Sequence, residues 1–499
     1  MRKLITIYSL FSILLFASCS KWLDVQPETE IDKTDLFSTE DGFKEALIGI
    51  YTRSAKADLY GKELTMGTPE VLAQNYTIAN FDPMRYQATK EYKYNDPYFV
   101  KRKDDLWKGL YHGIVNSNLI IQHIDAKKSL FVDDNFNIIK GEAFALRAYL
   151  HFDALRLFAP SFSQGSFAEA IPYVTTYSNL STKFGTVTSV LDSIIKDFEY
   201  AKTLLANDPI VKKDYVVGYP QQTDTLLNTE NTNPSLFLQN RRHRLNYYAV
   251  CASLARVYLY RGDWTNALIN AKIVIDSKKF PWTNSTDFLA VEEKNKDRIL
   301  YKELVFGWYI PNLNNSLNVN WFNTGTSGMY LDQTDSKIIY NVASDGATDM
   351  RYTQWFTTAS NGSSYISEIS KYRRNSMTEE ESANLHFLMA PGIKLSELYY
   401  IAAECTYATN PNLAISYINE VRMRRGIGQE LTVLNKEEFL DEVLKEYRKE
   451  LFAEGQLFYA YKRLNKAIQG LQGLVIQPSS NIFTLPIPDD EIIYGKLDN

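Results

Sequence analysis

The sequence is poor in cysteine and histidine. It has three cysteines in 499 residues, Cys19, Cys251 and Cys405, so a disulfide framework and an all-cysteine zinc site are excluded. Its five histidines show no HExxH or other paired-ligand spacing. Glycine-rich phosphate-binding loops are also missing. We therefore expect neither a metal site nor a cofactor.

An excess of positive charge is missing as well. The chain has 54 basic and 59 acidic residues and a formal net charge of −5, which argues against a nucleic-acid partner. The one basic cluster, Arg241 to Arg244, is interpreted as a solvated helix start or an ion-pair cluster. The 45% hydrophobic and 23% charged content is typical of globular proteins and excludes wholesale disorder.

Only one long hydrophobic run occurs, at the N-terminus. Leu4 to Ala17 follows Arg2 and Lys3, and it is shorter than the about 20 residues that a membrane-spanning helix needs. It has the size and flanks of a secretory signal. The small residues before Cys19 resemble a bacterial lipobox, which predicts that residues 1–18 are removed and that Cys19 carries acyl chains. The alternative is an ordinary signal peptide with a coincidental cysteine.

Apolar residues recur at helical spacing along most of the chain. The clearest such segments are 42–51, 106–124, 141–158, 187–205 and 437–464. Segments 248–276 and 395–425 each read as a helix, a turn and a second helix with small residues where the two helices meet, as in a tetratricopeptide-like unit. Because residues of different character separate these two copies, we expect a scaffold with large insertions rather than a continuous solenoid.

The predicted fold class is mainly α, a tetratricopeptide-like scaffold of helical pairs with large loop-rich insertions and minor β. Residues 304–310 form the one strand-like run of the second insertion, and residues 483–488 suit an extended closing strap. We expect five regions: a signal peptide at 1–18, a lipidated tether at 19–41, an N-terminal helical scaffold at 42–280 with loops at 60–100 and 207–240, an insertion at 281–392, and a C-terminal scaffold with the strap at 393–499.

The insertions combine aromatic rings with amide side chains. The chain has 34 Tyr and 7 Trp, whose rings offer a flat apolar face and a hydrogen-bonding edge, as a sugar ring requires. The same composition lines peptide grooves, and most such rings belong to the core. We expect a shallow platform built from residues 80–100 and 311–360. Its predicted stacking residues are Tyr92, Tyr94, Trp321 and Tyr330, and its predicted hydroxyl-binding residues are Arg85, Asn95 and Asn323.

A catalytic alternative rests on Glu450 and Glu454. Four residues apart on one helix face, the two carboxylates would lie about 5–6 Å apart, close to the separation in retaining glycosidases. Arg448, Lys449 and Lys462 are close in the sequence, so pairing of these glutamates with basic side chains is the competing interpretation. We favour that interpretation and expect no catalytic residue.

Several segments together resemble the SusD/RagB family of Bacteroidetes outer-membrane nutrient-binding lipoproteins. Their order and spacing over nearly the whole chain carry the resemblance. The matching segments are the lipobox with residues 22–27, the first-helix motif at 37–51, long helices at 107–118 and 142–158, the motif Arg448, Glu450, Leu451, Glu454 and Gly455, and the strap at 485–491.

The resemblance implies a lipid-anchored protein on the cell surface that captures oligosaccharides without catalysis. It also implies delivery of the ligand to a SusC-like, TonB-dependent outer-membrane barrel. Ligand residues do not carry over from the family, so the loop residues named above remain an inference from this sequence. Peptide ligands in the same role, and a lipoprotein glycoside hydrolase, stay open as alternatives.

Overall fold

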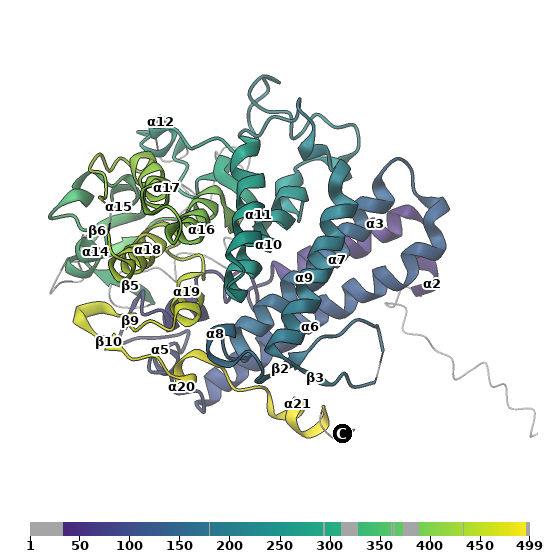
Figure 1. Cartoon of the computed structure of the whole chain (residues 1–499), viewed down its shortest axis with the longest axis horizontal. Helices are drawn as coiled ribbons and strands as arrows, with labels where there is room; N and C mark the ends of the chain where they lie inside the picture. Colours follow the sequence, from purple (N-terminus) through teal and green to yellow (C-terminus); the bar gives the residue numbers. More distant parts are fainter. Residues whose placement is uncertain are drawn as a thin grey trace, which may run out of the picture.

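The computed structural model describes residues 33–178, 180–292, 295–310, 328–360, 362, 365–372, 389–432 and 434–495. Helices dominate and strands are short, as predicted (Figure 1). Cys19, Trp321 and Asn323 lie outside the described residues. None of the helices that the structure describes combines the length and apolarity that a membrane crossing requires.

Four helices build the N-terminal part: α3 (Glu40–Ser54), α6 (Pro97–Ile124), α7 (Asn135–Phe158) and α9 (Val187–Leu204). Their starts follow from local chemistry, because the side chains of Thr39, Asp96 and Thr186 accept hydrogen bonds from first-turn amides. Helix α7 is buried along most of its length, since α3, α6 and α9 all pack against it. It is the central helix of this half of the molecule (Figure 1).

The two predicted repeats are both helical pairs. The first is α10 (Tyr247–Arg261) with α11 (Trp264–Ser277), and the second is α16 (Leu395–Tyr407) with α17 (Pro411–Arg424). Gly262 ends α10 in the left-handed conformation at φ 80°, which glycine adopts without steric cost. Helix α11 packs directly against α16. The pairs are therefore neighbours in space although the second insertion separates them in the sequence.

The expected helical segment 437–464 is two helices, α18 (Lys436–Glu450) and α19 (Leu457–Leu464). Between them Ala453 and Gly455 have positive φ angles of 61° and 72°. The buried Glu70 carboxylate accepts hydrogen bonds from both of their amides, at 3.0 and 2.8 Å. A long-range contact thus holds a break that helical periodicity does not indicate.

The strands form small antiparallel sheets. One has the order β1 (Thr77–Ile78), β5 (Met329–Asp332), β7 (Tyr365–Ile369) and β6 (Phe356–Ser360). A second pairs β4 (Leu304–Tyr309), which the sequence predicts, with β8 (Met389–Lys394), which it does not. The two remaining pairs are β2 (Glu169–Pro172) with β3 (Phe184–Thr186), and β9 (Ile468–Gln469) with β10 (Val475–Ile476).

Short helices complete the chain. They are α2 (Lys33–Leu36), α4 (Thr68–Leu72), α5 (Gln87–Lys90), α8 (Phe162–Gly165), α12 (Ser285–Phe288), α14 (Gln333–Ile339), α15 (Met350–Trp355), α20 (Ser480–Phe483) and α21 (Asp489–Tyr494). The segment between α20 and α21 runs extended along the N-terminal helices, and the Leu485 amide donates to the Leu157 carbonyl at 3.0 Å (Figure 1). This segment is the predicted strap.

The basic cluster at Arg241 to Arg244 is an ion-pair cluster, and it is buried rather than solvated. The Arg241 guanidinium binds Asp208 at 2.7 Å and Glu142 at 2.6 Å, and Arg242 binds Glu230 at 2.5 Å. Asp208 and Glu230 belong to the 207–240 segment, which therefore reaches into the interior instead of lying wholly on the surface. Opposite charges are what allow these arginines to be buried.

Candidate ligand-binding face

The β1–β5 ladder joins the residues just before the 80–100 segment to the 311–360 segment, and the platform is predicted from these two segments. Thr77 pairs with Tyr330 and Ile78 with Met329. Beyond the strands, the Ala79 amide donates to the Gly328 carbonyl, and the Gly328 amide donates to the Phe81 carbonyl. The start of the 80–100 segment therefore lies beside Gly328. We call the surface formed by residues 74–98, 328–332 and 471–474 the candidate face.

A buried frame holds the 81–98 segment in place. The Arg102 guanidinium donates to Thr89 Oγ1 at 2.9 Å and to the Met84 carbonyl at 2.7 Å, and it stacks 4.1 Å from the ring centre of Tyr86. The Tyr86 hydroxyl donates to Glu63 at 2.7 Å. Because these groups come from the buried side of α6 and from the core, the outer side chains stand on a rigid support.

Arg85 and Tyr98 are two exposed side chains of this segment that contact each other. The Arg85 guanidinium lies 5.3 Å from the ring centre of Tyr98, whose side chain is 55% exposed, and Phe81 nearby is 66% exposed. Arg85 was predicted from the sequence as a binding residue, whereas Tyr98 and Phe81 were not. The sequence does contain one indication that Tyr98 is exposed. Asp96 followed by Pro97 is typical of a helix start, and Tyr98 then falls in the exposed first turn of α6.

Tyr92 and Tyr94 are half-buried and hydrogen-bonded within the protein. The Tyr92 hydroxyl donates to the Leu72 carbonyl at 2.7 Å, and burial raises the pKa of Tyr92 to about 12. The Tyr94 hydroxyl donates to the Ile482 carbonyl at 2.7 Å, and its ring stacks on Phe99. Their hydroxyl groups are therefore already used in hydrogen bonds within the protein. Asn95 is exposed beside them, and Tyr330 is half-buried on β5.

A pocket of about 430 Å³ opens on the candidate face, between β1, α5 and the tip of the β9–β10 hairpin. Its lining residues are Gln74, Thr77, Lys90, Leu471, Gln472, Gly473 and Leu474. Gln74 Nε2 donates to the Lys90 carbonyl at 2.7 Å, whereas its buried Oε1 accepts no hydrogen bond from any described residue. Burial lowers the pKa of Lys90, and Asp335 and Asp332 oppose that shift.

The hairpin tip is held against the second insertion. The Gln472 amide donates to Asp335 Oδ1 at 2.9 Å, and its side chain donates to Asp332 Oδ2 at 3.2 Å. Gln74, Arg85, Tyr92 and Gln472 all have positive φ angles between 53° and 60°. Such backbone strain concentrates where a fold positions side chains for binding. Gln74, Lys90 and the hairpin tip were not predicted from the sequence, because only long-range contacts bring them together.

Glu450 and Glu454 do not form an acid pair open to a substrate. Burial alone would raise the pKa of Glu450, but Arg425, Lys394 and Arg351 outweigh burial and hold that pKa well below its usual range. Arg425 binds Glu450 at 2.8 Å, and Lys371 binds Glu454 at 2.6 Å. An enclosed carboxylate that is ionised in this way has no proton to give as a general acid. Among the described residues, no group of three or more His, Cys, Asp or Glu side chains is arranged to hold a metal ion.

Comparison with known proteins identifies families that this chain resembles. Residues 21–216 match a family model described as "Starch-binding associating with outer membrane", and residues 320–494 match the model of the SusD family. The SusD-like protein P38 of Formosa agariphila is 23% identical over 498 residues, which cover 93% of this chain and 92% of that protein.

Solved structures agree with these matches. A SusD superfamily protein from Bacteroides thetaiotaomicron superposes with a TM-score of 0.71 at 22% identity, covering 92% of this chain and 98% of its own. A SusD-like carbohydrate binding protein from Bacteroides vulgatus gives a TM-score of 0.70 at 17% identity, covering 92% and 97%. The fold, the family models and the full-length relative lead to one conclusion: the chain belongs to the SusD/RagB family.

Proposed function

We propose that this protein is a non-catalytic surface lipoprotein that binds oligosaccharides and passes them to a SusC-like, TonB-dependent transporter in the outer membrane. Family membership supports the role, because one matching family model is described as starch-binding and the similar Bacteroides vulgatus structure is that of a carbohydrate binding protein. The single observation that carries the proposal is the β1–β5 ladder, because it brings two polar, ring-bearing segments to one face beside a pocket.

The chemistry of the candidate face suits a sugar chain. Ring faces such as Tyr98 stack on the C–H faces of pyranoses, and the Arg85 guanidinium and the amides of Asn95 and Gln74 bind hydroxyl groups. Tyr330, Trp321 and Asn323 complete the proposed contacts, and Tyr92 and Tyr94 offer ring edges while they support the segment. Each contact contributes little net binding free energy once the entropy lost on ordering the ligand is subtracted. We therefore expect weak binding that improves with oligosaccharide length.

The test is the affinity of the full chain for a panel of oligosaccharides by calorimetry. Tyr98→Ala and Trp321→Ala should each weaken binding at least about tenfold, which corresponds to about 1.4 kcal/mol, and leave the melting temperature unchanged. Tyr494→Ala is the matched control, since Tyr494 is also an exposed tyrosine but lies on α21. Full affinity in the double variant of Tyr98 and Trp321 would remove the candidate face from consideration.

The same assay separates the alternatives. Retention of an intact oligosaccharide after prolonged incubation supports a binding protein, whereas release of shorter products would support a hydrolase. The enclosed ion pairs of Glu450 and Glu454 weigh against that second outcome. A pool of short peptides tested alongside the oligosaccharides decides between the two ligand classes that the sequence leaves open.

A further inference from the structure

Three aromatic side chains form a cluster on the outer surface of the helical pairs. Trp282 follows α11, Tyr399 lies near the start of α16, and Tyr417 lies on α17. The ring centres of Trp282 and Tyr399 are 5.2 Å apart, and those of Tyr399 and Tyr417 are 5.9 Å apart. Each of the three side chains is half-buried, so part of each ring lies at the surface. We call the surface formed by these three rings the second face.

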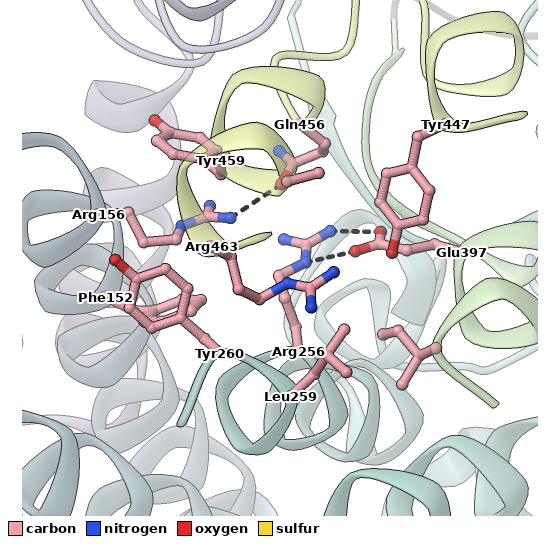
Figure 2. Close-up of a pocket in the computed structure, with 12 residues that line it drawn as sticks. Phe152, Arg156, Arg256, Leu259, Tyr260, Glu397, Tyr447, Gln456, Tyr459 and Arg463 are labelled. Atoms are coloured by element: carbon pink, nitrogen blue, oxygen red, sulfur yellow. Dashed lines mark hydrogen bonds and ion pairs between the residues drawn. The ribbon is translucent and has the colours of Figure 1, made fainter. Parts of the chain in front are cut away.

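The second face is separate from the candidate face and has a rigid support. Helices α11, α16 and α17 pack side by side, whereas α5 and the β9–β10 hairpin of the candidate face lie lower in the same view (Figure 1). The first turn of α16 is held from the interior, because Arg256 of α10 binds Glu397 through hydrogen bonds of 2.7 and 2.6 Å (Figure 2). The rings therefore stand on elements whose positions are fixed by packing and by a buried ion pair.

The polar edges of the three rings are available to a ligand. Trp282 Nε1 and the hydroxyls of Tyr399 and Tyr417 form no hydrogen bond with any residue that the structure describes, and none of these three atoms is enclosed. The half-buried Tyr407, also on α16, differs from them, because its hydroxyl donates to the Leu434 carbonyl at 2.7 Å. A ring with a free polar edge offers one ligand both an apolar surface and a hydrogen-bonding group.

Two exposed ion pairs flank the second face. Lys272 binds Asp276 at 3.0 Å on α11, and Arg424 binds Glu420 at 2.9 Å on α17. Both pairs lie close to the middle ring: burial raises the pKa of Tyr399, and Glu420 and Asp276 raise it further. Arg424 opposes that rise in pKa. Because the positive and negative charges balance, the second face favours neither an anion nor a cation.

We propose that the second face is a second binding site for a neutral oligosaccharide. The ligand class rests on the proposed function, but the site shares no residue with the candidate face. The ring faces pack against the C–H faces of sugars, and the ring edges and ion pairs supply the donors and acceptors that hydroxyl groups need. An apolar protein surface fits less well, because it would remove these polar edges from water without giving them partners.

A second site changes which ligands the protein holds. When one site has bound a long sugar chain, binding of the same chain at the other site becomes intramolecular. Two weak sites on one molecule then retain a polysaccharide more tightly than either site alone, provided that the chain spans both. The second face therefore favours polysaccharides over short oligosaccharides.

Calorimetry on the full chain tests the second face, with maltoheptaose, xylohexaose and mannohexaose as probes. The unmodified chain should bind at two sites, and the double variant Tyr98→Ala and Trp321→Ala should keep one. Adding Tyr417→Ala should weaken that remaining site at least about tenfold, with an unchanged melting temperature. Tyr417→Phe keeps the ring and the packing, and the loss of its hydroxyl should weaken the site about threefold. Tyr200→Ala is the matched control, since Tyr200 is an exposed tyrosine on α9.

The outcomes separate this inference from the proposed function. A remaining site that weakens with both changes at Tyr417 and persists in Tyr200→Ala supports the second face. Complete loss of binding in the double variant at the candidate face would overturn the second face and leave the proposed function standing. Absence of binding by every sugar probe would overturn both. Binding of a pool of short peptides, and of no sugar, at the second face would also overturn it.

Discussion

Glu70 differs from the other buried acids discussed above, because it makes no ion pair with any described residue. Its carboxylate instead accepts three hydrogen bonds, from Asn75 Nδ2 at 2.6 Å and from the amides of Ala453 and Gly455. Burial, only partly offset by these bonds and by Lys371, raises the pKa of Glu70 to about 7. The carboxylate that holds the break between α18 and α19 therefore changes its protonation state near neutral pH.

The first prediction concerns the pH dependence of stability. Between pH 4.5 and 7 the folded chain keeps a proton on Glu70 that the unfolded chain releases, so rising pH lowers the free energy of unfolding. Glu70→Gln removes this dependence. The melting temperature of the variant, measured relative to the unmodified chain, should therefore rise between pH 5 and pH 7.5.

Glu63→Gln provides the control for this measurement. Glu63 is also buried, but Arg102 and Lys62 outweigh burial and lower its pKa, so it stays ionised in both states above pH 5. Its melting temperature relative to the unmodified chain should stay flat over the same range. A flat difference for Glu70→Gln as well would contradict the assigned role of Glu70.

At the residue scale, the sequence predicts which segments form the candidate face better than which side chains point outward. Phe81 contacts Gly328, but the Tyr94 hydroxyl is held by the Ile482 carbonyl of α20 and Tyr98 is exposed beside Arg85. The sequence of closely spaced tyrosines does not itself indicate which of them is buried and which is exposed. The orientation of Tyr94 is decided by its contacts with Phe99 in the first turn of α6 and with Ile482, which is distant in the sequence.

At the scale of elements, the helical pairs depend on small residues at the contact between their helices. Ala255 on α10 and Ala267 on α11 are fully buried. Ala255→Phe should overpack this contact and reduce the free energy of unfolding by about 1–3 kcal/mol, which thermal melting will detect. Thr265→Phe on the exposed face of α11 is the control. Equal melting curves for both variants would argue against close helix packing at Ala255.

A second prediction at this scale concerns the attachment of the insertion. Glu450 of α18 binds Arg351 of α15 at 3.0 Å, Arg425 after α17 at 2.8 Å and Lys394 of β8 at 3.2 Å. Glu450→Ala leaves these buried cations without that carboxylate, so we expect a loss of about 3–5 kcal/mol in the free energy of unfolding. Chemical denaturation measures this loss. Glu437→Ala, on the exposed side of the same helix, should change stability little.

Helices were predictable because their periodicity is local, and most strands were not. The strands of the four-stranded sheet are two to five residues long and come from segments as distant as Thr77 and Ile369. Strands this short carry no reliable alternation of polar and apolar residues. The break at Ala453 escaped prediction for the same reason, since the carboxylate that holds it belongs to α4.

For the whole molecule, the decisive question is its attachment to the membrane. If Cys19 carries the lipid anchor, Cys19→Ala should yield unlipidated protein that is released or stalled at the inner membrane. Fractionation in cells that lack the partner barrel measures this directly, with Cys251→Ala as a control at a cysteine buried in α10. Recovery of the Cys19 variant in the outer-membrane fraction would refute lipid anchoring through this residue.

The packing of α11 against α16 also constrains the order of events during biosynthesis. The chain leaves the stack of helical pairs at Ser277 and returns to it at Leu395, so the side of α11 that faces α16 has no cover until α16 has been made. Contacts between such distant segments form late and leave apolar surface open to aggregation in the meantime. A nascent chain that has been exported only as far as the insertion cannot bury this side of α11, and productive folding must wait for α16 to arrive.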